Sequence, residues 1–355
     1  MQEKRTVKGE MTMMKMIPLS ALLALLLCAC GPSVKIESLG EQSFGEQEAL
    51  VEEISFRSDK FRVVGELRLP TAGEQHPAII IVNGSGSQTR DANDYLIEIF
   101  LRNGYAVFSW DKPGSGESTG EFTDEITQRA DVLVDGIEVL TEHQSIDPDR
   151  IGLWGLSQAG WVMPLAIEQS GNVAFMIVVG GGAEDSIEQM AYQIGQWVVC
   201  NGGSAEQAAL VELYWSQRAK ATGYDEYREA VEVLLGIPGV KDYTGLEITE
   251  EKDWEPWSRD WDAFIDPMEI IEHTTIPMLV FFGELDKNID PVQGAEAYEA
   301  ALQAAGNQDY RIVVIPGVAH TLTSAKTGCL NETWGTSYAP KYLQTLEAWL
   351  QHLSQ

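Results

Sequence analysis

Continuous apolar runs alternate with amphipathic stretches from about residue 50 to the end of the chain. Residues 77–83 form such a run, which is the pattern of a parallel strand covered on both faces. Runs of the same character follow at residues 105–110, 150–156, 174–180, 277–283 and 310–316. Helical patterns separate them at residues 92–102, 123–142, 158–168, 292–305 and 340–353. This order predicts an α/β fold with a mostly parallel sheet flanked by helices, because right-handed crossovers return over the sheet.

Two apolar segments precede the first parallel strand. Residues 51–56 and 61–69 are predicted to form an antiparallel pair that turns at Ser58-Asp59. The residues before this pair include Gly, Ser, Glu and Gln and few apolar side chains. We therefore expect residues 30–49 to be a tether.

One connection is too long for an ordinary crossover. About ninety residues lie between the strand that ends near Gly181 and the strand that begins near Pro277. They carry helical patterns at residues 186–199, 204–221 and 224–235. We expect a helical cap over residues 184–273, inserted into a core of residues 50–183 and 274–355. Its aromatic side chains are expected to pack the cap onto the core or to line an apolar pocket; they include Trp197, Tyr214, Trp215, Trp254, Trp257, Trp261 and Phe264.

The charge of the chain narrows the range of partners. There are 54 acidic and 24 basic side chains, which gives a formal net charge of −30, while 44% of the residues are hydrophobic. This composition is that of a globular protein with a real core. A field of this sign repels phosphate backbones, so nucleic-acid binding is not expected.

The first thirty residues have the pattern of an export signal. Four basic residues precede the apolar run 17–27, which is too short for a comfortable membrane span. The run ends in Leu27-Cys28-Ala29-Cys30-Gly31, which resembles a bacterial lipobox with Cys30 as the lipidated residue. We expect residues 1–29 to be removed, leaving a lipoprotein of the bacterial cell envelope whose only membrane attachment is the lipid on Cys30. An ordinary secretory signal is the alternative.

The exported chain keeps two further cysteines. Cys200 and Cys329 lie outside the reducing cytosol in this interpretation, where a disulfide is possible. Their spacing alone does not establish whether they pair.

A candidate nucleophile follows the strand at residues 150–156. That strand runs into Gly155-Leu156-Ser157-Gln158-Ala159-Gly160 and then into a helix. A serine between small residues at a sharp strand-to-helix turn is typical of a nucleophile elbow, in which the hydroxyl stands above the sheet. We therefore interpret Ser157 as a nucleophile.

A general base for this serine can be found by elimination among five histidines. His76, His143, His273 and His352 precede strands or lie on helices, whereas His320 follows the strand at 310–316. Ligands gather at the carboxyl ends of parallel strands, so His320 is the predicted base.

The base needs a carboxylate partner, and the tetrahedral intermediate needs amide donors. Asp286, after the strand at residues 277–283, fits the carboxylate best, with Glu284 and Asp290 as alternatives. The amide of Gln158 is the first predicted oxyanion donor. The second is expected from Ser85 or Gly84, in the glycine-containing loop after the strand at residues 77–83.

Together these motifs resemble the α/β-hydrolase family, in its bacterial esterase and serine-aminopeptidase-like branch. Asn83-Gly-Ser-Gly-Ser-Gln-Thr-Arg-Asp91 is similar to that branch's His-Gly-Ser-Gly-Pro-Gln-Asp-Arg-Asp loop, although Asn83 replaces the usual His. Trp110-Asp-Lys-Pro-Gly-Ser-Gly-Glu-Ser-Thr-Gly120 is similar to its Tyr-Asp-Lys-Arg-Gly-x-Gly-x-Ser-x-Gly turn, in which we interpret Asp111 as a turn-stabilising carboxylate. The resemblance implies a hydrolase without metal or cofactor that acts on carboxylic esters or related acyl bonds.

The leading functional interpretation is a serine esterase for small esters with short acyl chains. A serine peptidase for short peptides is the main alternative, with Glu250, Glu251 or Glu255 of the cap as candidate ligands for a free amine. A thioesterase and a non-catalytic binding lipoprotein are the remaining alternatives. The complete set of Ser157, Asp286 and His320 argues against the last of these.

Overall fold

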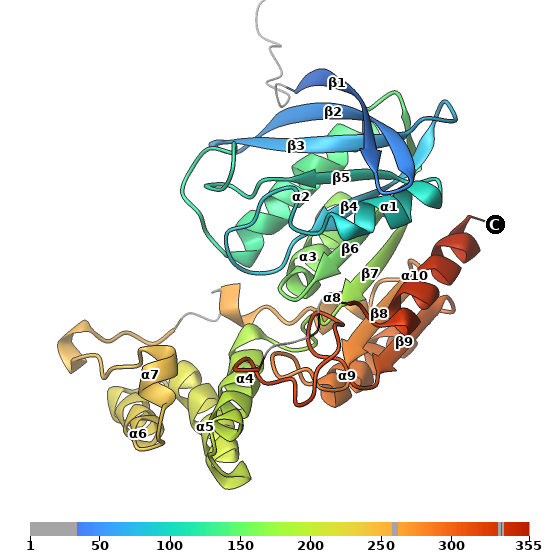
Figure 1. Cartoon of the computed structure of the whole chain (residues 1–355). Helices are drawn as coiled ribbons and strands as arrows, with labels where there is room; N and C mark the ends of the chain where they lie inside the picture. Colours follow the sequence, from blue (N-terminus) through green and yellow to red (C-terminus); the bar gives the residue numbers. More distant parts are fainter. Residues whose placement is uncertain (1–33, 258–261, 333–334, 336, 355) are drawn as a thin grey trace, which may run out of the picture.

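A computed structural model describes residues 34–257, 262–332, 335 and 337–354 of the chain. The signal sequence, Cys30 and Trp261 lie outside the described residues. Within them a nine-stranded sheet runs in the order β1-β2-β3-β5-β4-β6-β7-β8-β9 (Figure 1). Its strands are β1 (Lys35–Phe44), β2 (Gln47–Ser58), β3 (Phe61–Pro70), β4 (His76–Val82), β5 (Ala106–Trp110), β6 (Ile146–Leu156), β7 (Phe175–Val179), β8 (Met278–Gly283) and β9 (Tyr310–Ile315).

The sheet is antiparallel at one side and parallel over the rest. Strands β1, β2, β3 and β5 pair antiparallel, whereas β5, β4, β6, β7, β8 and β9 pair parallel. The helices that alternate with the strands are α1 (Tyr95–Arg102), α2 (Ile126–Thr141), α3 (Ala159–Ser170), α9 (Pro291–Ala304) and α10 (Pro340–Leu353). The predicted α/β fold is therefore confirmed, with strand and helix bounds within a few residues of those expected.

Both faces of the parallel sheet are buried in β4, β5, β7 and β8 and in the second half of β6, which explains the continuous apolar runs. In β4, Ile80 and Val82 pack into a core cluster with α2, α3 and α9, while Ile79 and Ile81 pack into a second cluster with α1 and α10. Successive side chains of a strand point to opposite faces. A strand covered on both sides therefore needs apolar residues at every position.

The expected tether is wrong for most of its length. Residues 35–44 form β1, which pairs antiparallel with β2 in a register from Lys35↔Ser55 to Phe44↔Gln47. Most β1 side chains are exposed, including Ile36 and Leu39. Main-chain hydrogen bonds rather than a buried face hold this edge strand, so its residues show no periodic apolar pattern.

The long insertion is helical and has a core of its own. It contains α4 (Ser186–Cys200), α5 (Ala205–Lys220), α6 (Tyr224–Leu235), α7 (Val240–Thr244), η1 (Glu251–Asp253), η2 (Asp262–Phe264) and α8 (Met268–Ile271). Apolar residues of α4 to α7 form a cluster separate from those of the sheet. In Figure 1, α5, α6 and α7 project away from the sheet, at the opposite end of the molecule from β1.

A disulfide joins the cap to the core. Cys200, at the end of α4, is bonded to Cys329 in the loop after β9, with their Cα atoms 5.7 Å apart. This pairing answers the question that the sequence leaves open.

Among the described residues, no helix has the length and apolar character needed to span a membrane.

Candidate active site

Ser157 stands at the turn between β6 and α3. Its φ is +58°, in the left-handed region that non-glycine residues rarely adopt. Its amide donates to the carbonyl of Val179 at the end of β7, with an N···O distance of 2.9 Å. This is the strained strand-to-helix turn expected of a nucleophile elbow.

Asp286 and His320 form a buried pair beyond the ends of β8 and β9. The Asp286 Oδ2 atom lies 2.7 Å from Nδ1 of His320, and the two side chains are 0% and 7% exposed. The other carboxylate oxygen accepts from the amides of Asn288 and Ile289 at 2.8 and 3.0 Å. The carboxylate is thus held so that it orients the imidazole.

The alternative carboxylates have other partners. Glu284 accepts the amide of Gly317 at 3.0 Å. Asp290 caps the first turn of α9 by accepting from the amides of Val292 and Gln293. Of the three candidates, the structure places Asp286 against His320.

The ring of His320 lies over the end of β7, beside the elbow. A Cβ at Gly180 would stand 3.0 Å from Nδ1 of His320, and the neighbouring Val179 carries the carbonyl that accepts from Ser157. The remaining ring nitrogen, Nε2, is buried and has no hydrogen-bond partner among the described residues. It can therefore serve a hydroxyl or a substrate at this position.

The predicted oxyanion loop lies against Ser157. A Cβ at Gly84 would stand 3.3 Å from the Cβ of Ser157, so a side chain at this position would crowd the elbow. Ser85 and Gln158 line the same cleft as Ser157. Within the described part of the chain, the amides of Ser85 and Gln158 donate to no partner. Both are thus available to bind an oxyanion.

Two buried cations that the sequence analysis missed hold this loop. Lys112 donates to the carbonyls of Gly84 and Gly86, the latter at 2.8 Å. Arg129 donates to the carbonyl of Asn83 and to the side chain of Gln158. Burial lowers the pKa of Lys112 to about 7 and that of Arg129 to about 10.

Asp124 completes this support. Its carboxylate accepts from the amide of Gly86 at 2.9 Å and lies 3.5 Å from Nζ of Lys112. Its carbonyl accepts from Nε2 of Gln158 at 2.8 Å. The oxyanion loop and the elbow are therefore held together by Lys112 and Asp124, which lie between β5 and α2, and by Arg129 of α2.

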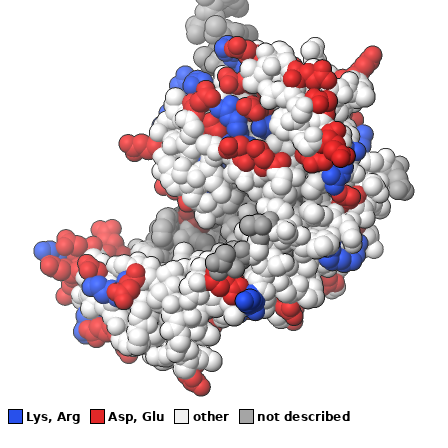
Figure 2. All heavy atoms as spheres, in the orientation of Figure 1, with Lys and Arg blue, Asp and Glu red and all other residues white. Residues whose placement is uncertain are grey.

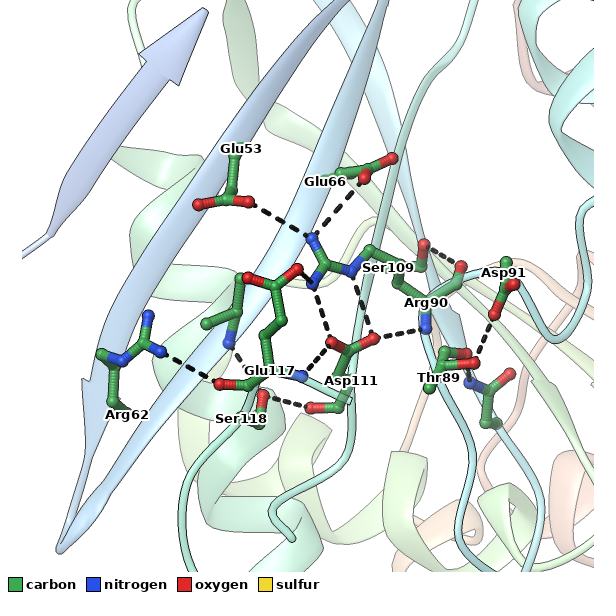
Figure 3. Close-up of polar contacts among 12 residues, drawn as sticks. Glu53, Arg62, Glu66, Thr89, Arg90, Asp91, Ser109, Asp111, Glu117 and Ser118 are labelled. Carbon is green, nitrogen blue, oxygen red and sulfur yellow. Dashed lines mark hydrogen bonds and ion pairs between the residues drawn. The ribbon is translucent and has the colours of Figure 1, made fainter. Parts of the chain in front are cut away.

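A second network anchors the far end of the loop, at Arg90 (Figure 3). Asp111 accepts from the amide and Nε of Arg90 at 2.9 and 3.1 Å, and from the amide of Glu117 at 2.8 Å. Burial opposes ionisation of Asp111, but these hydrogen bonds outweigh it and lower its pKa. The interpretation of Asp111 as a turn-stabilising carboxylate is confirmed.

Arg90 also reaches the antiparallel strands. Its guanidinium lies 3.6 Å from Glu53 in β2 and 3.5 Å from Glu66 in β3 (Figure 3). Asn83, at the other end of the loop, donates to the carbonyl of Thr89 at 3.3 Å and accepts from Asn93 at 2.7 Å. The departure from the usual histidine at Asn83 thus leaves the loop with internal hydrogen bonds.

A cleft of about 570 Å³ opens over the elbow, between core and cap. On the core side it is lined by Ser85, Ser157, Gln158 and Trp161, and on the cap side by Met190, Trp215, Arg218 and Trp257. Three cap carboxylates named as amine ligands do not line it in the described structure: Glu250, Glu251 and Glu255.

An elbow serine, a buried His–Asp pair and a parallel sheet define the protein as a serine hydrolase with the α/β-hydrolase fold. The family model described as X-Pro dipeptidyl-peptidase (S15 family) matches residues 59–321, and the chain belongs to this family. The predicted resemblance to the α/β-hydrolases is thereby confirmed.

Two relatives show how far the sequence similarity extends. The chain is 30% identical over 256 residues to an uncharacterized 31.7 kDa protein of the Escherichia coli traX-finO intergenic region, covering 68% of this chain and 83% of that protein. It is 29% identical over 117 residues to the thiohydrolase aneE of Aspergillus aculeatus, covering 32% of this chain and 36% of that protein.

Solved structures share the fold at low identity. The acetyl xylan esterase from Paenibacillus sp. R4 superposes with a TM-score of 0.55 and 11% identity, over 91% of this chain and 89% of that one. Acetyl xylan esterase 1 from Thermoanaerobacterium sp. JW/SL YS485 gives 0.53 and 15%, over 92% and 89%. At these identities the likeness supports the fold alone.

Proposed function

We propose that the protein hydrolyses small carboxylic esters through an acyl-enzyme intermediate on Ser157. The observation that carries this proposal is the geometry of His320: Nδ1 is bound to Asp286, and Nε2 is buried with no partner among the described residues. The solved relatives named as acetyl xylan esterases are consistent with ester chemistry on this fold.

The proposed steps assign one role to each of these groups. Nε2 of His320 takes the Ser157 hydroxyl proton as Oγ attacks the ester carbonyl, and the amides of Ser85 and Gln158 bind the resulting oxyanion. His320 then returns the proton to the leaving alcohol as the acyl-enzyme forms. A water molecule attacks the acyl group by the same route, which releases the carboxylic acid and restores Ser157.

A substrate panel tests this proposal. We expect 4-nitrophenyl acetate and butyrate to be cleaved with a higher kcat/KM than 4-nitrophenyl palmitate, because the cleft of about 570 Å³ suits small ligands. The same panel includes aminoacyl and Xaa-Pro 4-nitroanilides. If any anilide is cleaved faster than every ester, the proposed esterase activity is wrong and the protein is a peptidase.

The peptidase remains the second candidate because the matching family is described as X-Pro dipeptidyl-peptidase. Recognition of a free amino terminus needs a carboxylate in the binding site. The candidates Glu250, Glu251 and Glu255 are absent from the described cleft lining. The lining does contain three other carboxylates, Asp124, Glu125 and Asp262, of which Asp124 and Asp262 already accept from main-chain amides. The substrate panel therefore decides between ester and peptide.

We also propose that the chain is exported as a lipoprotein of the bacterial cell envelope, anchored through Cys30. The basic residues before the apolar run 17–27 and the lipobox-like sequence support this proposal. The disulfide between Cys200 and Cys329 is consistent with an oxidising compartment.

A further inference from the structure

Arg218 of the cap is held between two tryptophans on the wall of the cleft. The central guanidinium carbon lies 4.1 Å from the ring centroid of Trp215 and 4.7 Å from that of Trp257. All three residues line the cleft that contains Ser157. Stacking on two aromatic faces fixes the plane of a guanidinium and leaves its edge free to donate.

This guanidinium has no protein acceptor in the described structure. Arg218 forms no ion pair or hydrogen bond there, and its Nε is buried without a partner. Nε1 of the adjacent Trp215 is a second buried donor without an acceptor. A buried donor without an acceptor destabilises the fold, so the site is incomplete without an acceptor.

The other described cations of the cap do have carboxylate partners. They pair as Lys220 with Glu188, Arg228 with Glu232, Lys241 with Glu247, and Lys252 with Glu250. In a chain with 54 acidic and 24 basic side chains, carboxylates are plentiful. An arginine that faces the cleft without one is therefore a departure from the surrounding pattern.

The carboxylates of the cleft stand elsewhere on its lining. Asp124 accepts from Gly86 on the oxyanion loop, and Asp262 accepts from the first amides of α2 at Ile126 and Thr127. Glu125 also lines the cleft, at the start of α2. These carboxylates repel an anionic ligand from the side of the cleft near α2. The cap side, at Arg218, is the side that attracts an anion.

We propose that Arg218 binds a carboxylate of the substrate, so that the enzyme prefers esters that carry a second, ionised acid group. This inference rests on the proposed ester hydrolysis and names its substrate class. A guanidinium and a carboxylate match in planar, two-point hydrogen bonding, and the pair is stronger in a partly desolvated cleft. Arg218 acts as a specificity residue and takes no part in proton transfer.

Two matched substrate pairs test this inference. In the first pair, mono(4-nitrophenyl) adipate carries a carboxylate at the end of its acyl chain, and 4-nitrophenyl hexanoate is the neutral match. In the second pair, 4-acetoxybenzoate carries a carboxylate on its phenol leaving group, and the methyl ester of this acid is the neutral match. In Arg218→Met we expect kcat/KM for the anionic member of at least one pair to fall about 10- to 100-fold. The neutral members should change by about threefold or less, and the pair that responds identifies the side.

Two further variants separate charge from packing. Arg218→Lys keeps the charge and should retain part of the preference for the anionic ester. Arg228→Met removes an exposed cap cation that pairs with Glu232, and it should leave both members unchanged. Equal losses on neutral and anionic esters in Arg218→Met would show that Arg218 only supports packing, and unchanged activity on all four esters would also overturn the proposal.

A binding measurement keeps this inference separate from the proposed function. Calorimetric titration of adipate into Ser157→Ala and into Ser157→Ala/Arg218→Met does not depend on turnover. We expect the Kd to rise about tenfold or more when Arg218 is replaced. Equal Kd values would reject the role of Arg218, whereas failure of the wild-type protein to cleave any ester would reject the esterase and leave the carboxylate site standing if the Kd still shifts.

Discussion

Ser157, Asp286 and His320 come from three separate strand ends, and a parallel sheet brings those ends to one edge. Each residue can therefore be tested alone. We expect Ser157→Ala and His320→Ala to remain folded and to lower kcat by about four to six orders of magnitude. The double variant should be little worse than either single variant, because the two residues share one step. Ester turnover measured with a folding check by circular dichroism decides this.

The carboxylate assignment has its own controls in the neighbouring acids. Asp286→Asn should lose about 10⁴-fold in kcat, because the imidazole loses its tautomer and its ionic partner. Glu284→Gln should stay near wild-type turnover. Near-normal kcat in Asp286→Asn with a large loss in Glu284→Gln would reassign the carboxylate partner of His320 to Glu284. Near-normal turnover in folded Ser157→Ala would rule out the acyl-enzyme mechanism.

The half-buried carboxyl group of Glu184 makes the stability of the fold depend on pH. Burial raises its pKa to about 7, although Gln293 donates to it at 2.6 Å. The unfolded chain loses this proton at a lower pH than the folded chain, so ionisation destabilises the fold as the pH rises from about 4.5 to 7, and the cost stays constant above that. We expect Glu184→Gln to raise the thermal midpoint at pH 8 and to lose this advantage towards pH 5. An equal gain at both pH values would contradict the ionisation argument.

Among the elements, the disulfide between Cys200 and Cys329 bridges 129 residues of sequence. It ties α4 of the cap to the loop beyond His320. Replacing both cysteines by serine should lower the free energy of unfolding by about 2–4 kcal/mol, because the unfolded chain regains its loop entropy. Denaturant unfolding of this variant, beside the wild type with and without dithiothreitol, measures the effect. If dithiothreitol lowers the stability of the double-serine variant as well, the loss does not come from this bond.

The elements also show which parts of the site a sequence can reveal. Apolar runs buried on both faces reveal β4 to β8, and an apolar run that is only partly buried reveals the edge strand β9. Polar residues after three of these strands reveal Ser157, Asp286 and His320. Arg129 and Arg218 lie within helices, where an arginine gives no sign of what it faces after folding. β1 was missed for a related reason, since an edge strand with exposed faces needs no apolar period.

At the scale of the whole molecule, Figure 2 shows acidic side chains on both the antiparallel end of the sheet and the outer cap. The net charge of −30 favours solubility and gives an incoming anion no general attraction. Selection for an anionic substrate must therefore act locally, in the cleft at Arg218. Local pairs in partly desolvated sites are screened by salt less than the surface field is.

The proposed anchor is tested on the intact chain in bacteria. Cys30→Ser should abolish labelling with radioactive palmitate and release the protein from membranes, because that thiol is the proposed acceptor of the lipid. Cys28→Ser is the matched control and should remain labelled. Continued labelling of Cys30→Ser would show that the lipobox interpretation is wrong.

The strand β1 changes what such an anchor would do. Only residues 31–34 separate Cys30 from the start of β1 at Lys35, a contour of about 17 Å at full extension. With so short a connection, β1 and β2 would lie next to the bilayer. The cap, at the opposite end of the molecule in Figure 1, would face the surrounding solution. An enzyme mounted in this way draws its substrates from solution, and the lipid matrix beneath it serves as a support.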